Sequence, residues 1–290
     1  MKITNKLNLP QPFVDCVSKE YEYKDKRYSV TTVIKGVKEI LLQRRHSNEI
    51  EQDVSDMIWL IWGTAMHKVL EEGKEAKDEL KETKIQITMP NGYTLSGQQD
   101  LYSESLKRIT DYKSGTVWKV IYGDWEDYRK QCLIYAYMFD QLGFDVDNAD
   151  IVMVLKDWSQ TKAKTEDNYP QYPVHIEHFN FDATDFANIE KELIEKFEEI
   201  ERCEKLADDD IPVCSKEERW STPTKYALMK RSRKTAIKLY DTKEDAESKA
   251  NELGEGHYVE IRKGEDKKCE NYCSCRQFCN YWRSTHEEGI

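Results

Sequence analysis

The 290-residue sequence lacks any apolar run near the roughly 20 residues that a membrane-spanning helix needs. Residues 1–12 lack the apolar core and the small-residue cleavage site of a secretory signal. Internal repeats and low-complexity stretches are missing too, while 39% of the residues are hydrophobic and 11% are aromatic. These features exclude membrane-spanning and disordered chains, and we expect a globular cytoplasmic protein with no membrane partner.

Positive charge is in short supply, because 55 acidic residues outnumber 44 lysines and arginines and give a net charge of -11. This balance argues against a protein that coats nucleic acid without regard to sequence. It leaves room for a local site, because an enzyme that holds a few phosphates needs only a short basic strip and metal ions. Eight cysteines in a cytoplasmic protein favour metal ligands where they cluster and core residues where they do not.

Hydrophobic periodicity divides the chain at about residue 207. Before this point the period is helical, changes to two, and becomes helical again, which indicates helices flanking a central sheet. The predicted elements are helices over 33–41, 56–80, 125–142 and 182–206, and strands over 85–89, 93–102, 106–113, 150–155 and 173–179. We therefore predict an α/β domain over residues 1–207.

The sequence pattern changes at the acidic junction formed by residues 208–212. The pattern predicts strands over 226–230, 235–240 and 257–262 and a helix over 243–253, followed by four cysteines within eleven residues. We therefore predict that residues 208–290 form a small α+β lobe that is closed by a metal-binding cysteine cluster.

The first candidate site combines Asp100 with the sequence Asp-Tyr-Lys at 111–113. An acid, one spacer and a lysine also occur elsewhere in this chain, for example at 22–24, 82–84 and 266–268, so the pattern alone decides nothing. Geometry singles out this copy. A turn centred on Glu104 and Ser105 would pair residue 100 with about residue 109, so that the two acids and Lys113 share one face of the sheet, with Cβ atoms roughly 7 to 8 Å apart on the diagonal.

Two carboxylates at that spacing can hold a hard divalent cation such as Mg²⁺, which keeps several waters and accepts oxygen ligands. Such a cation polarises a phosphoryl oxygen and makes a nucleophilic water available at neutral pH. Lys113 would orient that water or balance the charge that builds on the phosphate. The alternative is a surface hairpin whose charges are merely solvated.

Two further motifs flank the predicted sheet. His67 ends a Gly-Thr-Ala-Met-His sequence in the preceding helix, and Gln131 lies one helical turn before Tyr135 in the following helix. With these motifs in this order, residues 28–160 resemble the RecB-type branch of the PD-(D/E)XK nucleases. The resemblance implies a restriction-endonuclease-like core, in which a central mixed β-sheet is flanked by helices.

The resemblance also implies residue roles. The metal ligands would be His67, Asp100, Asp111 and the backbone carbonyl of Tyr112, and the catalytic residues would be Asp100, Asp111, Lys113, Gln131 and Tyr135. Gln99 stands where the family name has proline, and the acid before Lys113 is Asp instead of the commoner Glu. Neither departure removes an oxygen ligand. The implied cofactor is Mg²⁺ or Mn²⁺.

The cysteines at the end of the chain form the second candidate site. Four thiolates suit either tetrahedral zinc or an iron-sulfur cluster, and spacing alone does not choose between them. The interval from Cys273 to Cys279 resembles the iron-sulfur staple of AddB-type and CRISPR-adaptation nucleases. Those relatives take a fourth cysteine from before the nuclease motifs, where this chain offers Cys16.

The whole chain also resembles nuclease-like proteins of bacteriophages, through Ser29-Val30-Thr31 and the segment from Cys214 to Trp220. This resemblance favours a [4Fe-4S] cluster, with zinc as the alternative, on the set Cys214, Cys269, Cys273 and Cys279. Cys275 is left as a spare, and the remaining cysteines are expected to be core residues.

Basic residues suggest where DNA would bind. The predicted DNA contacts are Ser29, Thr31, Arg44, Arg45, Lys230, Arg231 and Arg233. The alternative for the last three is a solvated hairpin tip.

The function expected from this set is a divalent-metal-dependent deoxyribonuclease, an exonuclease of phage or mobile-element replication and recombination, working in the host cytoplasm if a phage encodes it. Its substrate would be single-stranded DNA or duplex ends. The sequence has no helicase P-loop, so a helicase or recombination partner would be a separate protein. The alternatives are a noncatalytic, metal-stapled module that binds DNA ends or a partner, and a hydrolase that acts on RNA.

Overall fold

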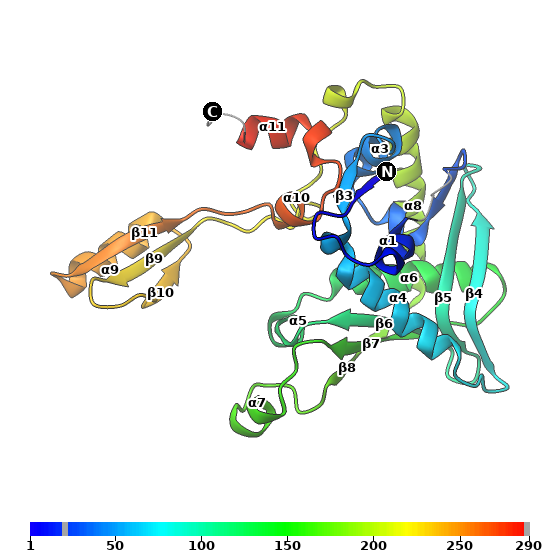
Figure 1. Ribbon diagram of the computed structural model, residues 1–290, viewed down its shortest axis with the longest axis horizontal. Helices are drawn as coiled ribbons and strands as arrows, with labels where there is room; N and C mark the ends of the chain where they lie inside the picture. Colours follow the sequence, from blue (N-terminus) through cyan, green and yellow to red (C-terminus); the bar gives the residue numbers. More distant parts are fainter. Residues whose placement is uncertain (19–22, 287–290) are drawn as a thin grey trace. The chain divides into compact units, whose positions relative to one another are not determined.

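The computed structural model describes residues 1–18 and 23–286 and divides into two compact units, Met1–Ala207 and Asp208–Ile290 (Figure 1). Within the described residues, no helix is long and apolar enough to cross a bilayer. Unit 1 contains, in chain order, β1 (Lys2–Thr4), α1 (Gln11–Val17), β2 (Arg27–Ser29), α2 (Val30–Val33), α3 (Val37–Arg45), β3 (Glu51–Asp53), η1 (Val54–Met57), α4 (Ile58–Glu71), β4 (Glu79–Thr88), β5 (Thr94–Ser103), β6 (Arg108–Gly115), α5 (Val117–Tyr122), α6 (Glu126–Gln141), β7 (Asn148–Leu155), α7 (Gln160–Thr165), β8 (Val174–Asn180) and α8 (Ala183–Cys203).

The centre of unit 1 is a mixed sheet built around β5. Strand β4 pairs with β5 along one edge, and β2 and then β6 pair with its other edge. The sheet continues from β6 to β7 and β8, with parallel pairing at β2–β5 and β6–β7 and antiparallel pairing elsewhere. The predicted α/β class with a central mixed sheet flanked by helices is confirmed.

The apolar side chains of the sheet are covered mainly by α6, which packs against β4, β6, β7 and α8. Nine consecutive residues of α6, Gln131 to Phe139, are buried. Helix α8 is amphipathic and buries one stripe, beginning with the side chains of Ile189 and Leu193. Helix α4 instead lies against β6 and η1, and every one of its residues keeps part of its surface exposed.

Two predicted helices differ from the observed ones. The first is split into α2 and α3, because the chain turns at Lys35 and Gly36 and Gly36 becomes the N-cap of α3. The second was expected to run over 56–80, but α4 ends at Glu71 and Leu80 belongs to β4, where it pairs with Tyr102. The prediction was wrong there because an apolar strand residue was counted as part of a helical stripe.

Unit 2 contains η2 (Asp208–Asp210), β9 (Lys225–Lys230), β10 (Lys238–Tyr240), α9 (Lys243–Leu253), β11 (His257–Arg262), α10 (Lys267–Asn271), η3 (Arg276–Phe278) and α11 (Asn280–His286). Its sheet is antiparallel with β9 between β10 and β11, and α9 packs against β9 and β11. The observed β10 is shorter than the predicted strand over 235–240. Unit 2 is thus a small α+β arrangement in which the cysteine-bearing segments, around α10 and η3, follow the sheet in sequence.

Candidate functional site

Asp100 lies where β5 changes partners. Strand β2 pairs with β5 up to Ser96, and β6 takes over from Leu101, so residues 97–100 lie between two partner strands on the same edge. The observed pairing of Leu101 with Thr110, continued by one residue, puts Asp100 directly opposite Asp111. The predicted pairing of residue 100 with about 109 was wrong, because the turn is longer than expected, and the correction brings the two acids closer together than a diagonal would.

The carboxylate of Asp100 connects three elements. Its Oδ2 accepts a hydrogen bond of 2.7 Å from the backbone N–H of Tyr112, which takes the place of a ladder bond. Its Oδ1 lies 3.3 Å from Nδ1 of His67 on α4, and the His67 ring lies beside the Tyr112 ring. The structure therefore brings His67 and Asp100 together. The Tyr112 backbone contacts Asp100 through its N–H, so the predicted role of its carbonyl as a metal ligand stays a prediction.

Asp111 is deeply buried, with 4% of its surface exposed. Its Oδ1 accepts a hydrogen bond of 3.0 Å from the side-chain amide of Gln131 on α6. Its Oδ2 lies 2.5 Å from Nζ of Lys113, two residues further along β6. The structure therefore also groups Asp111, Lys113 and Gln131, so both acids have one carboxylate oxygen held by the protein.

Burial and mutual charge shift the titration of this group. Burial raises the pKa of Asp111, with the charge of Asp100 adding to the effect and the Lys113 ammonium opposing it. Burial works against the Lys113 ammonium, but the charge and hydrogen bond of Asp111 together with the charge of Asp100 outweigh burial and leave the pKa of Lys113 above its usual value. The hydrogen bond to Asp100 raises the pKa of His67, against the effect of burial. The site thus concentrates negative charge that a cation would neutralise.

Glu82 is a member of this site that the sequence analysis did not include. It lies in β4 at the position opposite Asp100, between the paired residues Lys81 and Thr83. His67, Glu82 and Asp100 each offer a ligand atom, and these atoms lie within 4.8 Å of one another. Glu82 adopts φ +46°, a left-handed conformation that costs a non-glycine residue energy and often marks functional sites. Its position opposite Asp100 and its backbone strain, which the sequence does not reveal, distinguish Glu82 from Glu79, the other acid of β4.

The Tyr135 side chain fills the space where β5 lies between partners. Its hydroxyl donates a hydrogen bond of 3.0 Å to the Gln98 carbonyl, and its ring lies against Gly97, where a Cβ atom would come within 2.5 Å of it. Gln98 in turn donates to the Glu82 carboxylate at 2.6 Å. Tyr135 and Gly97 therefore fix the backbone next to Asp100.

Gln99 extends the same arrangement on β5 and is 1% exposed. Its side-chain amide donates to the carbonyls of Thr110 at 2.9 Å and Leu101 at 3.2 Å. The side chain thus ties β5 to β6 just where the backbone ladder ends. A proline at this position, as in the family name, has no amide to make these bonds.

The cysteines of unit 2 lie in loops and very short helices. Burial, followed by the charges of neighbours that include Cys273, Cys214 and Cys279, raises the pKa of the Cys269 thiol to about 12. Cys275 is 1% exposed and its sulfur lies 3.6 Å from that of Cys273. Among the described residues, however, no three cysteine sulfurs lie within 4.8 Å of one another, so a metal centre on Cys214, Cys269, Cys273 and Cys279 stays a prediction.

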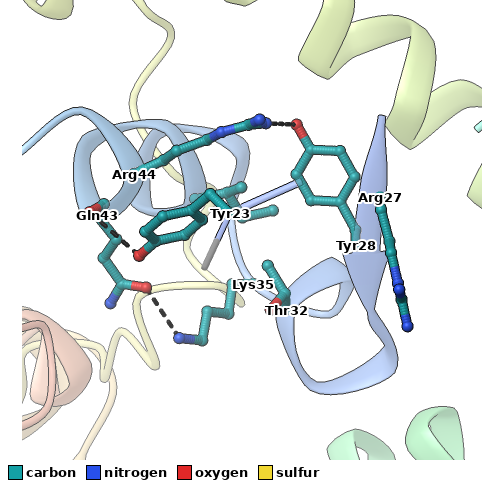
Figure 2. A pocket seen from close by; sticks show the side chains of 8 residues that line it. Tyr23, Arg27, Tyr28, Thr32, Lys35, Gln43 and Arg44 are labelled. Carbon is teal, nitrogen blue, oxygen red and sulfur yellow. Dashed lines mark hydrogen bonds between the residues drawn. The ribbon is translucent and has the colours of Figure 1, made fainter. Parts of the chain in front are cut away.

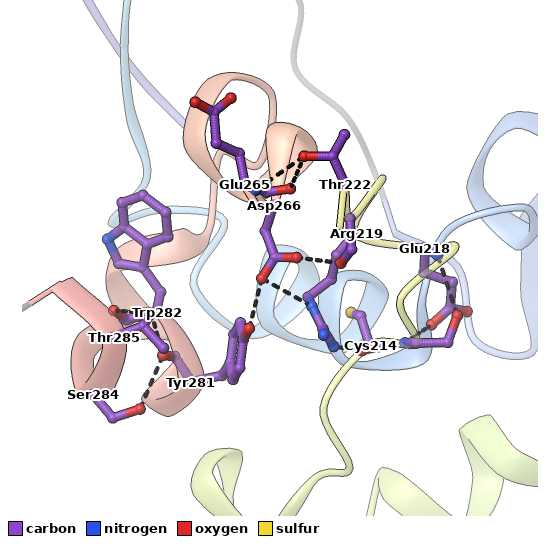
Figure 3. A network of polar contacts seen from close by, with 12 residues as sticks. Cys214, Glu218, Arg219, Thr222, Glu265, Asp266, Tyr281, Trp282, Ser284 and Thr285 are labelled. Atoms are coloured by element: carbon purple, nitrogen blue, oxygen red, sulfur yellow. Dashed lines mark hydrogen bonds and ion pairs between the residues drawn. The ribbon is translucent and has the colours of Figure 1, made fainter. Parts of the chain in front are cut away.

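A polar network joins the segment that carries Cys214 to the segment that carries Cys269 (Figure 3). Its centre is Asp266, which accepts hydrogen bonds from Arg219 at 3.1 Å, from the Tyr281 hydroxyl at 2.6 Å and from Ser221. Arg219 also donates to the Cys214 carbonyl. These bonds hold the two cysteine-bearing segments of unit 2 together.

The predicted DNA contacts of unit 1 already have structural partners. Ser29 caps α2 by accepting from the Thr32 N–H, and it lies 3.1 Å from the Thr31 hydroxyl. Arg44 donates to Tyr28 and pairs with Glu204, and Arg45 donates to the Glu204 carbonyl at the end of α8. A contact with DNA stays a prediction for these four residues.

A cavity of about 170 Å³ lies beside Arg44 (Figure 2). Arg27, Lys35 and Arg44 line it together with Tyr23 and Tyr28. The Lys35 ammonium bonds to Gln43 at 3.0 Å and lies 3.8 Å from Glu39, so part of its charge is compensated.

In unit 2, Lys230 ends β9, and Arg231 and Arg233 lie in the exposed turn that follows it. This position agrees with either of the two interpretations, a DNA contact or a solvated hairpin tip.

No family model and no curated protein sequence matches the chain. Among solved structures, similar ones include that of SSO0001, which is 14% identical over 64% of this chain and 82% of that chain, with a TM-score of 0.43. The alkaline exonuclease LHK-Exo from Laribacter hongkongensis, in complex with dAMP, is 16% identical over 61% of this chain and 89% of that chain, with a TM-score of 0.39. A phage-related exonuclease from Haemophilus somnus is 13% identical over 66% and 77%, with a TM-score of 0.30. Similarity this weak assigns no function, so the function has to be inferred from the residues of this chain.

Proposed function

We propose that the protein is a divalent-metal-dependent deoxyribonuclease of the RecB-type branch of the PD-(D/E)XK nucleases. The observation that carries the proposal is the grouping of two buried carboxylates with a lysine and a histidine at the point where β5 changes partners. A buried acid pair of this kind is costly for stability, and such groups concentrate at functional sites. An exonuclease of phage or mobile-element DNA is the form of this activity that the sequence resemblance favours.

The donor set fits a divalent cation. One imidazole nitrogen and two carboxylate oxygens from His67, Glu82 and Asp100 lie within 4.8 Å of one another. Asp111 follows Thr110 on the neighbouring strand and is not a member of this group, so its role as a ligand rests on the sequence resemblance. Carboxylates suit Mg²⁺ and Mn²⁺, and the added imidazole favours Mn²⁺ more than Mg²⁺. A bound cation would polarise the scissile phosphate and lower the pKa of a water.

The protein groups around the acids would position the reacting atoms. The raised pKa of Lys113 keeps its ammonium charged, so this group can orient the attacking water or balance the charge on the phosphate. Gln131 holds one oxygen of Asp111 and leaves the other directed at Lys113. Tyr135 would act indirectly, because its hydroxyl bonds to the Gln98 carbonyl and so fixes the backbone near Asp100.

The decisive experiment replaces Asp111 with alanine and measures the digestion of labelled single- and double-stranded DNA, and of RNA, with Mg²⁺ and Mn²⁺. We expect the rate to fall by at least about a thousandfold, because a metal-binding carboxylate is lost. Asp145→Ala is the matched control, since that side chain is 78% exposed and forms only a surface ion pair with Lys107. Unchanged activity in Asp111→Ala would refute the enzyme, and inactivity of the wild type would favour a DNA-binding module. Digestion of RNA alone would change the substrate.

Glu82 has a test that does not depend on catalysis. If it is a ligand, Glu82→Gln weakens Mn²⁺ binding by about tenfold or more, as measured by calorimetry or by electron paramagnetic resonance of the bound ion. Glu79→Gln is the matched control, because Glu79 lies in the same strand and pairs with Ser103, three residues away from the site. Equal affinities for the two variants would remove Glu82 from the ligand set.

For unit 2 we propose a metal centre on Cys214, Cys269, Cys273 and Cys279. Two observations support this choice of ligands: Cys273, Cys214 and Cys279 are close enough to Cys269 for their charges to raise its pKa, and the network around Asp266 joins the segments that carry Cys214 and Cys269. A [4Fe-4S] cluster and a zinc ion both suit such a set. Anaerobic purification followed by iron, sulfide and zinc analysis separates them, since a brown protein with iron and sulfide has a cluster and a colourless protein with zinc does not.

A further inference from the structure

Several aromatic side chains near the proposed active site are exposed instead of packed. Trp118 and Tyr122 on α5 are 60% and 76% exposed, and Trp59 on α4 is 61% exposed. Exposing large rings in this number is unfavourable in water, and such surfaces usually mark binding sites. None of these rings has a role in the proposed metal chemistry.

Two of the rings already form a stack. Trp118 and Tyr122 are one helical turn apart, with ring centroids 5.4 Å apart and an angle of 10° between the ring planes. Nearly parallel rings present a flat outer face, and their exposure leaves that face open. A nucleobase is a flat aromatic group that can continue such a stack.

Lys156 connects Trp59 to the same end of the sheet. Its ammonium lies 4.1 Å from the centre of the Trp59 ring. Its backbone N–H donates to the Gly115 carbonyl at 2.9 Å, and Gly115 ends β6 two residues before α5 begins. The exposed rings therefore lie at the end of the strand that carries Asp111 and Lys113.

A lysine side chain lies between the exposed rings and the proposed acid site. The Lys119 ammonium, on α5, lies 4.8 Å from the centre of the Tyr128 ring. Tyr128 lies on α6 three residues before Gln131, whose side-chain amide bonds to Asp111, so it lies on the side of α6 that faces the proposed active site. Lysines that alternate with aromatic rings are the usual chemistry of single-strand binding, because the ammonium groups follow phosphates while the rings stack on bases.

We propose that Trp59, Trp118, Lys119, Tyr122 and Lys156 form a platform that binds unpaired nucleotides of the substrate. Base faces in a duplex are covered by their neighbours, so stacking on these rings requires a single strand or an unpaired end. The platform thereby selects single-stranded DNA for the site at Asp100 and Asp111. It rests on the proposed function only in that the strand it binds is the substrate of that site.

The lysines decide against an apolar protein partner. A partner that covered Trp59, Trp118 and Tyr122 with apolar side chains would also bury the Lys156 ammonium without a phosphate to pair with, which is costly. The Lys119 ammonium already donates to the Asp124 carbonyl, but a neutral carbonyl does not cancel its charge. A polyanion meets both requirements, since it offers phosphates to the lysines and flat bases to the rings.

The test measures binding separately from cleavage. Full-length Asp111→Asn protein in EDTA is titrated with fluorescent oligothymidylate and with a blunt duplex, with and without the double substitution Trp118→Ala/Tyr122→Ala. The loss of one stacked base corresponds to about 5- to 150-fold weaker binding, and we expect a loss in this range for the single strand alone. Trp118→Phe/Tyr122→Phe keeps the rings and should retain most of the affinity.

Leu106→Ala is the matched control, because this 54% exposed apolar residue lies in the turn before β6, at the other end of that strand. It should bind both DNAs like its parent. Equal binding of the single strand by parent and double variant overturns the platform. A dimer that the double variant abolishes in sedimentation would also overturn it, because the rings would then be a protein interface.

The outcomes separate this proposal from the proposed function. Weaker single-strand binding in the double variant, together with an inactive wild type, supports the platform and refutes the nuclease. An active wild type whose affinity and strand preference ignore Trp118 and Tyr122 refutes the platform and leaves the nuclease in place.

Discussion

The acid site of unit 1 and the cysteine site of unit 2 are held in place by different means. Asp100, Asp111 and Lys113 lie on long strands whose ladder fixes their spacing, and Asp111 is buried with protein partners. The cysteines lie in loops and in helices of seven residues or fewer, and one network around Asp266 joins their segments. The acid site is thus positioned by the strands themselves, whereas we expect the cysteine site to need a bound metal in addition to its polar network.

Cys273→Ser should have the largest effect, because it should unfold part of unit 2 without affecting unit 1. Binding of a structural metal contributes on the order of 10 kcal/mol to the folding of small metal sites. Losing one thiolate should therefore unfold the cysteine-bearing segments of unit 2 while the sheet of unit 1 stays folded. Hydrogen exchange followed by mass spectrometry measures the two units separately, and we expect fast exchange in residues 208–286 and unchanged protection in β4 to β7.

Cys16→Ser is the control for this experiment. The prediction that the remaining cysteines lie in the core is confirmed for Cys132 and Cys203 but wrong for Cys16, which is exposed on α1 of unit 1. It should keep the full metal content and the protection of both units. Unchanged melting and metal content in Cys273→Ser would show that Cys273 is not a ligand, and unfolding of unit 1 in the same variant would show that the units are not independent.

Lys113→Met tests how the fold of unit 1 stabilises its charges. Removing one partner of a buried ion pair costs about 3 to 5 kcal/mol, because the other charge is left uncompensated. We expect a loss of this size at neutral pH in EDTA, measured by urea unfolding. Lys68→Met is the matched control, since Lys68 is 67% exposed and pairs only with Glu71 on the surface.

The loss in Lys113→Met should depend on pH. Burial already raises the pKa of Asp111, and without the ammonium group it rises further. Below about pH 4 such a carboxyl is neutral in both the folded and the unfolded state and does not affect stability. As the pH rises, the unfolded state releases the proton more readily than the folded state, so the free energy of unfolding falls. The difference from the wild type should therefore grow as the pH rises from about 5 to 8, and a constant difference would contradict the buried-charge explanation.

Long periodic segments let the sequence predict most of the sheet and the helices that cover it. Helix α8 and strand β6 lie close to their predicted ranges, because apolar residues recur at the period of each structure. The short parallel pairings β1–β3 and β2–β5 were not predicted, because three-residue strands carry too little pattern. The helix predicted over 56–80 was too long because a single apolar residue such as Leu80 fits the period of a strand as well as that of a helix.

The acid site was predicted in composition but not in register. Motif order identified Asp100, Asp111 and His67, whereas the length of one turn decided that the two acids lie opposite each other. Glu82 could not be predicted, because its role follows from a strained residue at the facing position of β4. Sequence spacing thus finds residues on one hairpin but not those that a third strand brings to it.

Asp266→Asn tests how much the polar network of unit 2 contributes to the cysteine site. The substitution removes the charge that Arg219 and the Tyr281 hydroxyl both contact, and a hydrogen bond to a charged group contributes about 1.5 to 3 kcal/mol. We expect the melting temperature of the unit 2 transition in the metal-free protein to fall, with a smaller fall once metal is bound. Glu265→Gln is the control, because only the backbone of Glu265 bonds to Thr222. An equal fall with and without metal would mean that the network does not assist the thiolate site.

Gln99→Leu is the mildest way to disturb the acid site. Leucine keeps the volume of this buried side chain but loses the two bonds from its amide to the Thr110 and Leu101 carbonyls. Its other side-chain atom, the amide oxygen, has no hydrogen-bond partner within the described chain, so leucine also relieves a burial cost, and the stability should change by only about 1 kcal/mol. Activity should nevertheless fall several-fold, because the tie between β5 and β6 holds Asp100 opposite Asp111. Comparing urea midpoints with digestion rates checks this, and a fall in stability without a fall in rate would show that Gln99 supports the fold alone.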